Sequence, residues 1–273
     1  MSEYMIVPKD SIDDTADAIK TKLGTQNDLT WGQDGFASYV EDIPSGTDYL
    51  EQLLGKTITS YTNANLTELK TLRTFQDQTT LLSFSFPNVE TITNAAGFCF
   101  SGCTGLTSIP ASAFPKLKAI RASNIFEKCS NLTVAVLPSV SDVGQNNIFY
   151  NCTQLAIADL GSATDTVGST NIMNQYFFYG CSSLTTVIIR KPVIAKLGNI
   201  NSFAGTPFAS GGTGGTIYIP KSLYDHLGDG GSYDYKAATN WSTVDGYGTI
   251  TWAKIEGSYY ETHYADGTLI PST

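Results

Sequence analysis

One seven-residue phrase recurs four times in this chain, each time with Phe, Cys and Leu in the same places. The four copies begin at Phe100, Phe126, Phe149 and Phe178. Their spacings of 26, 23 and 29 residues match one coil of a stacked repeat and are shorter than helix-pair repeats of about 33 residues or more. The chain is therefore predicted to be a solenoid, whose function depends on what its surface presents.

Two short apolar runs follow each phrase and predict two strands in every coil. After Phe126, for example, the runs are residues 132–137 and 140–143, with Pro138 between them. Strand-length apolar runs bounded by Gly, Pro, Asn and Ser are typical of short strands joined by tight turns. Weaker copies at Phe75 and Phe203 predict atypical end coils, which a solenoid needs to cover its core.

The phrase and its two runs resemble the BspA-like class of leucine-rich repeats over about residues 60–220. This resemblance implies a curved solenoid with a parallel strand from every coil. Members of the class are chiefly surface or adhesion proteins, so the resemblance implies binding rather than catalysis. It fixes no ligand.

The C-terminal part resembles the cap found on such repeats, which consists of one strand, a proline and a short helix. The resemblance lies in residues 217–224 and, after an insertion, residues 235–242. The insertion at residues 226–234 predicts an exposed loop. Residues 247–255 and 259–270 alternate like strands and predict a hairpin around residues 265–267.

The N-terminal part has a different character, because Ser11 and the apolar residues up to Leu23 predict a capped helix. Residues 12–43 resemble a segment found at the start of phage and prophage structural proteins of Gram-positive gut bacteria, which implies a role in attachment. The alternative is an ordinary helical cap over the first coil. The domain division is residues 1–45, an N-terminal helical attachment module; 46–74, a linker helix and N-terminal cap; 75–213, the solenoid; and 214–273, the C-terminal cap and hairpin.

Composition and charge restrict the partners. No apolar run approaches the roughly 18 residues of a membrane-spanning helix, and the first residues lack the features of a secretory signal. Residues 1–52 contain 11 acidic and 3 basic side chains, which argues against binding nucleic acid. The cluster Lys116, Lys118, Arg121 and Lys128 would suit an anionic glycan, although scattered surface lysines are the simpler interpretation.

The residues that carry catalysis or bind metals are scarce. The chain has two histidines, and neither lies in a nucleophile, zinc or phosphate-binding motif. Because Cys103, Cys129, Cys152 and Cys181 share one coil position, they are predicted to be stacked free thiols in the core. We therefore expect no enzyme activity, no cofactor and no metal.

These observations favour a phage or prophage virion protein, associated with the tail, that recognises a host surface protein or glycan. The N-terminal helices would bind other virion proteins, and a homo-oligomer is compatible with this role. The alternative is an adhesion or protein-binding module on the bacterial cell surface. The predicted ligand-binding residues are Tyr233 and Tyr235, assigned to the inserted loop, and Tyr224.

Overall fold

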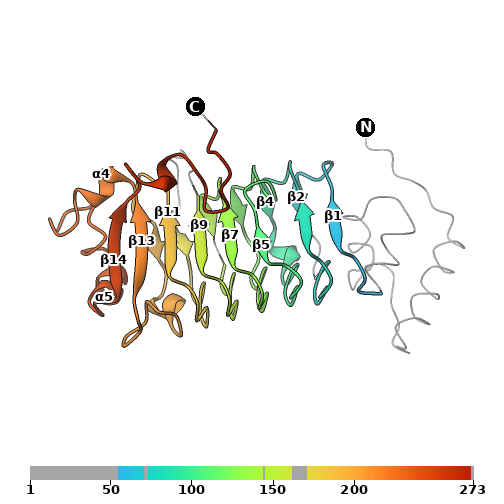
Figure 1. Cartoon of the computed structure of the whole chain (residues 1–273), viewed down its shortest axis with the longest axis horizontal. Helices are drawn as coiled ribbons and strands as arrows, with labels where there is room; N and C mark the ends of the chain where they lie inside the picture. Colours follow the sequence, from blue (N-terminus) through green and yellow to red (C-terminus); the bar gives the residue numbers. More distant parts are fainter. Residues whose placement is uncertain (1–54, 71–72, 144, 162–170, 272–273) are drawn as a thin grey trace, which may run out of the picture.

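The computed structural model describes residues 55–70, 73–143, 145–161 and 171–271. The predicted N-terminal helices and the predicted boundary at residue 45 lie outside the described residues. The described part is a stack of coils in which every strand of a sheet comes from a different coil (Figure 1).

The larger sheet has six parallel strands in the order β14-β13-β11-β9-β7-β5. Its strands are β5 (Ser108–Ile109), β7 (Val134–Leu137), β9 (Ile157–Leu160), β11 (Thr186–Ile189), β13 (Gly215–Ile219) and β14 (Ile250–Lys254). In the first coils, β1 (Ser60–Thr62) pairs with β3 (Ser83–Ser85). Alternate side chains of these strands point into the core, as Ala135 and Leu137 do on β7.

The second run of each coil forms a parallel sheet of shorter strands. Four of them lie in the order β2-β4-β6-β8, and β10 pairs with β12 beyond them. Their bounds are β2 (Glu68–Leu69), β4 (Thr91–Ile92), β6 (Ala119–Ile120), β8 (Asp142–Val143), β10 (Asn171–Met173) and β12 (Lys196–Leu197). The predicted parallel strands of a leucine-rich repeat fold are therefore confirmed.

The repeated phrase forms a turn that stacks one aromatic ring per coil in the core. Centroids of successive rings lie 5.0–5.8 Å apart, from Phe75 through Phe100, Phe126, Phe149 and Phe178 to Phe203. All six rings are at most 1% exposed. The predicted column of Phe side chains is thus a continuous apolar core.

The cysteines close the same turns. All five are buried and free, as predicted for the four phrase cysteines. The thiol of each phrase cysteine donates a hydrogen bond to the carbonyl of the Phe one coil back, as from Cys152 Sγ to Phe126 O at 3.0 Å. The equivalent distances for Cys103, Cys129 and Cys181 are 2.9, 3.2 and 3.0 Å. A small side chain with a weak donor fits this narrow corner.

The predicted C-terminal cap is present as β13, Pro220 and the short helix α4 (Lys221–Tyr224). Helix α5 (Trp241–Asp245) follows, with Trp241 in the core. Short 3-10 turns are η1 (Asn94–Ala96), η2 (Ile200–Phe203) and η3 (Tyr259–Glu261).

The hairpin prediction for residues 247–270 is partly wrong. Residues 250–254 do not enter a hairpin but extend the large sheet as β14, parallel to β13. The turn at residues 265–267 is real, because His263 and Leu269 form an antiparallel bridge across it. The turn does not pair with β14 but lies over the large sheet. There Ala265 bonds to Asp159 of β9, and Asp266 bonds to Ala111, just after β5.

Candidate functional site

The C-terminal strap, residues 259–271, lies across the outward face of the large sheet (Figure 1). At one end Tyr260 packs on Tyr218 of β13, with ring centroids 4.8 Å apart. At the other, the amide of Ala111, just after β5, donates to the carboxylate of Asp266 at 2.7 Å. Between these ends Tyr264 joins Val136 in a small second core. The strap therefore covers part of the face that an open sheet would present.

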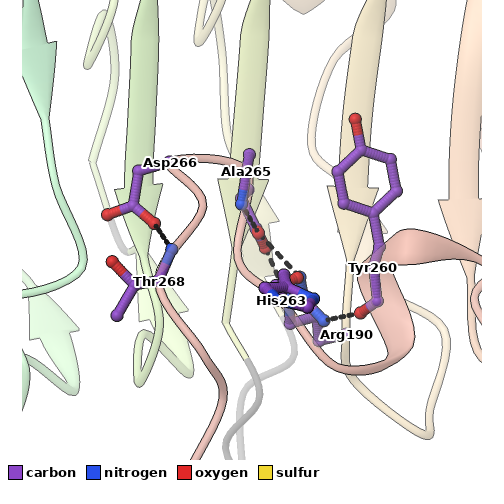
Figure 2. A network of polar contacts seen from close by, with 7 residues as sticks. Arg190, Tyr260, His263, Ala265, Asp266 and Thr268 are labelled. Atoms are coloured by element: carbon purple, nitrogen blue, oxygen red, sulfur yellow. Dashed lines mark hydrogen bonds and ion pairs between the residues drawn. The ribbon is translucent and has the colours of Figure 1, made fainter.

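One buried ion pair anchors the strap (Figure 2). Arg190 donates to both carboxylate oxygens of Asp159, at 2.6 and 2.7 Å. It also donates to the carbonyls of Tyr260 and His263, at 2.6 and 3.0 Å, and the amide of Ala265 donates to Asp159 at 2.9 Å. Burial raises the pKa of Asp159, and its bonds from Arg190 oppose that rise. This arrangement holds the strap to the sheet.

The three predicted tyrosines do not form one surface. Tyr233 is 52% exposed in the inserted loop, beside the ring of His226 at 5.7 Å. Tyr224 is half-buried and packs against the core. Tyr235 is fully buried, accepts a hydrogen bond from the amide of Ala195 at 2.9 Å and meets the ring of Trp241.

The predicted exposure of Tyr235 is therefore wrong. The carboxylate of Asp234 accepts bonds from the amides of Gly230 and Lys236, which ends the loop and turns the next residue inward. Burial raises the pKa of the Tyr235 phenol. Tyr235 stabilises the cap, whereas the ligand-binding role of Tyr233 and Tyr224 stays a prediction.

Each cation of the predicted basic cluster has a polar partner, and three of the four partners are carboxylates. The pairs are Lys116 with Asn88 at 2.8 Å, Lys118 with Glu90 at 3.0 Å, Arg121 with Asp142 at 2.7 Å and Lys128 with Glu127 at 2.9 Å. Lys118, Arg121 and Lys128 are thus paired with carboxylates, whereas Lys116 is bonded to a neutral amide and keeps its positive charge.

A hollow of about 640 Å³ lies on the phrase turns of three consecutive coils. Its volume is within the range of small-molecule sites, roughly 300–1,000 Å³. We call it the tyrosine groove. Its lining residues are Glu127, Lys128, Asn147, Tyr150, Asn151, Tyr176 and Tyr179.

The repeat places the three groove tyrosines together. Tyr150 and Tyr179 occupy the second position of successive phrases and stack with centroids 4.9 Å apart and rings 6° from parallel. Tyr176 meets Tyr179 edge-on at 5.5 Å and 82°. Asn147 and Tyr176 both precede a phrase Phe by two residues and have left-handed backbones, with φ of 62° and 58°. The sequence carried this signal as a Tyr after Phe in two adjacent phrases, but the tyrosines there were not predicted as ligands.

Polar groups occupy the rest of the groove. Glu127 is 8% exposed and accepts a bond from Asn124 at 2.6 Å besides its ion pair with Lys128. The hydrogen bond that Lys128 donates to the Glu127 carboxylate raises the pKa of Lys128. The side-chain oxygen of Asn147 is buried and accepts no hydrogen bond. Buried acceptors without a hydrogen bond are uncommon in folded proteins.

The described residues contain neither a metal-binding cluster nor a membrane-spanning helix. In that part of the chain no three His, Cys, Asp or Glu side chains gather into a metal-binding group. No helix there is long and apolar enough to cross a bilayer.

Comparison with known proteins bears on the repeat. Two solved structures are similar to this chain. The leucine-rich repeat protein of T. pallidum has 25% identity and a TM-score of 0.40, and the match covers 50% of this chain and 61% of that chain. A leucine-rich repeat protein of Bacteroides ovatus ATCC 8483 has 17% identity and a TM-score of 0.27, and the match covers 73% of this chain and 55% of that chain. The chain thus matches less than two thirds of either protein. No curated protein matches it.

A protein-family model gives the assignment. The model for the BspA type leucine rich repeat region matches six copies over residues 68–206, just over half of the chain. This range contains all four perfect phrases and the tyrosine groove. The chain therefore belongs to the BspA-type leucine-rich repeat family.

Proposed function

We propose that this chain is a non-catalytic recognition protein that binds a protein or glycan on a cell surface through the tyrosine groove. The observation that carries the proposal is the cluster of three half-buried tyrosines around a hollow with an unsatisfied acceptor. Tyrosine offers a large, rigid, amphipathic contact area at low entropic cost. Because the stacked coils hold the rings in place without a ligand, binding loses little further conformational freedom.

The experiment is a cell-binding assay with the full-length chain. Labelled wild-type protein and the Tyr150→Ala and Tyr179→Ala variants are incubated with a panel of intact bacterial and epithelial cells. Binding that is saturable and weakened in both variants supports the proposal. The control is Leu82→Ser, which alters a 60% exposed side chain that does not line the groove. Equal binding by all four proteins, or none by wild type, contradicts the proposal.

The place of display is a further part of the proposal. The resemblance of residues 12–43 to phage structural proteins favours display on a virion tail, with those residues bound to other virion proteins. Membership of the BspA-type family favours an adhesion module on a bacterial surface instead. Mass spectrometry of purified phage particles and of surface-labelled cells from the same culture separates the two. Recovery of the chain with particles, in a fixed copy number, supports the virion assignment, and recovery only from the cell surface contradicts it.

A further inference from the structure

We infer that the tyrosine groove binds an uncharged glycan, an inference that rests on the proposed function and names the ligand class. Three properties of the groove carry it. These are the arrangement of the rings, the buried acceptor of Asn147 and the balanced charge of Glu127 and Lys128.

The rings offer apolar surface along two directions. Tyr150 and Tyr179 cover one face of each other, and both residues line the groove. Tyr176 stands almost perpendicular to Tyr179 and forms a corner with it. A pyranose ring has C–H groups on its faces and hydroxyls around its rim. Such a ring packs on a tyrosine face while its hydroxyls reach neighbouring polar groups, including the phenol oxygens.

The polar lining matches those hydroxyls. The side-chain oxygen of Asn147 is buried without a donor, and leaving it so is unfavourable. A sugar hydroxyl can donate to this oxygen once the Asn147 side chain turns toward the groove, and it can still accept a bond itself. Asn151 lines the same groove, and its side-chain amide can both donate and accept. A ligand rich in groups that are donor and acceptor at once therefore fits better than one with acceptors alone.

This requirement argues against a proline-rich peptide, the other ligand that aromatic grooves commonly bind. Proline has no backbone N–H and no side-chain donor, so the proline residues of such a peptide offer Asn147 no hydrogen bond. Four of the seven lining residues are also polar or charged, namely Glu127, Lys128, Asn147 and Asn151.

The charges of the groove argue against an anionic ligand. Lys128, the one cation among the described residues that line the groove, is held by Glu127 at 2.9 Å. A carboxylate or sulfate in the groove would compete with Glu127 for Lys128 and would be repelled by the Glu127 carboxylate. An uncharged oligosaccharide meets neither obstacle.

The test is an array of neutral, sialylated and sulfated glycans, followed by calorimetry with the best soluble oligosaccharide. Wild type is expected to bind neutral glycans. Tyr176→Ala, Tyr179→Ala and Asn147→Gly are each expected to weaken binding by about tenfold or more. Glycine adopts the left-handed backbone of residue 147 without strain, so Asn147→Gly removes the acceptor with its turn intact. Leu82→Ser should bind as wild type, and thermal melting confirms that each variant folds.

The alternatives give distinct results. Preference for charged glycans, or groove variants that bind glycans as wild type does, overturns the inference. The inference is also overturned if Tyr233→Ala loses glycan binding while the groove variants keep their glycan binding. Cell binding that depends on the groove, survives periodate oxidation of cell-surface sugars and disappears after protease treatment overturns the glycan inference but leaves the proposed function intact. The absence of any groove-dependent binding to cells or glycans removes both.

Discussion

Arg190 and Asp159 form a bidentate ion pair on the outward side of the large sheet, where side chains are normally solvated. Their side chains are 6% and 0% exposed. Asp159 lies on β9, and Arg190 follows the last residue of the neighbouring β11. The same guanidinium binds two carbonyls of the strap. The strap therefore shields the ion pair from water, and the Arg190 side chain of that pair in turn holds the strap on the sheet.

Removal of the Arg190 guanidinium is expected to destabilise the folded chain. Arg190→Ala leaves the Asp159 carboxylate buried without its partner, which we expect to lower the free energy of unfolding by about 3–5 kcal/mol. Urea denaturation followed by circular dichroism measures this loss. The matched control is Lys118→Ala, which breaks the exposed pair with Glu90 and should cost no more than about 1 kcal/mol. Equal losses in the two variants would show that the strap does not desolvate the pair.

The coil core gives a second prediction. Leu155 closes the Phe149 phrase and is fully buried, so Leu155→Ala should leave a cavity and destabilise the chain by about 2–5 kcal/mol. Leu82 is 60% exposed, and Leu82→Ala should change stability by about 0.5 kcal/mol or less. Thermal and urea unfolding of both variants provide the comparison. A neutral Leu155→Ala would contradict the alignment of the coils.

The sequence predicted the coils well because each coil repeats one physical solution. Phe126, Cys129 and Leu132 recur in register, so burial of one implies burial of its equivalents along the stack. The short strands after each phrase were predicted for the same reason, and the observed β7 and β8 fall inside the predicted runs 132–137 and 140–143.

The strap and the groove were not predictable in this way. Asp159 and Ala265 are 106 residues apart, and Ala111 and Asp266 are 155 apart, and no periodicity connects them. A single acid in the apolar run of β9 was the only local signal. Tyr150 and Tyr179 were visible in the phrases, but their meeting with Tyr176 depends on the left-handed turns that only the fold shows.

Glycine at position 161 is expected to be indispensable. Gly161 has φ of +54°, and an added Cβ would lie 2.0 Å from the carbonyl oxygen of Val140, a backbone atom that cannot turn aside. Gly211 has φ of +75° with nothing within 4 Å of such a Cβ. Gly211→Ala should therefore lower the free energy of unfolding by only about 1–2 kcal/mol, the cost of a left-handed residue. Gly161→Ala should lower it by clearly more, and similar unfolding curves for the two variants would contradict the close contact.

The buried thiols are expected to resist alkylation in the folded chain. Burial raises the pKa of Cys181 to about 12, and burial also raises the pKa values of Cys103 and Cys152 well above the ordinary thiol value. Because a thiol reacts as its thiolate, raising the pKa lowers the reactive fraction at pH 8. At that pH the native protein should react slowly with a thiol reagent such as dithionitrobenzoate.

Unfolding removes the burial that raises these pKa values, so all five cysteines should react promptly in denaturant. Ser232→Cys places a thiol on the exposed inserted loop and provides the control, with one rapid equivalent expected in the native state. A phrase cysteine that reacts as fast as this loop thiol would mean that its coil opens to solvent. Its hydrogen bond to the preceding Phe carbonyl would then not be maintained in solution.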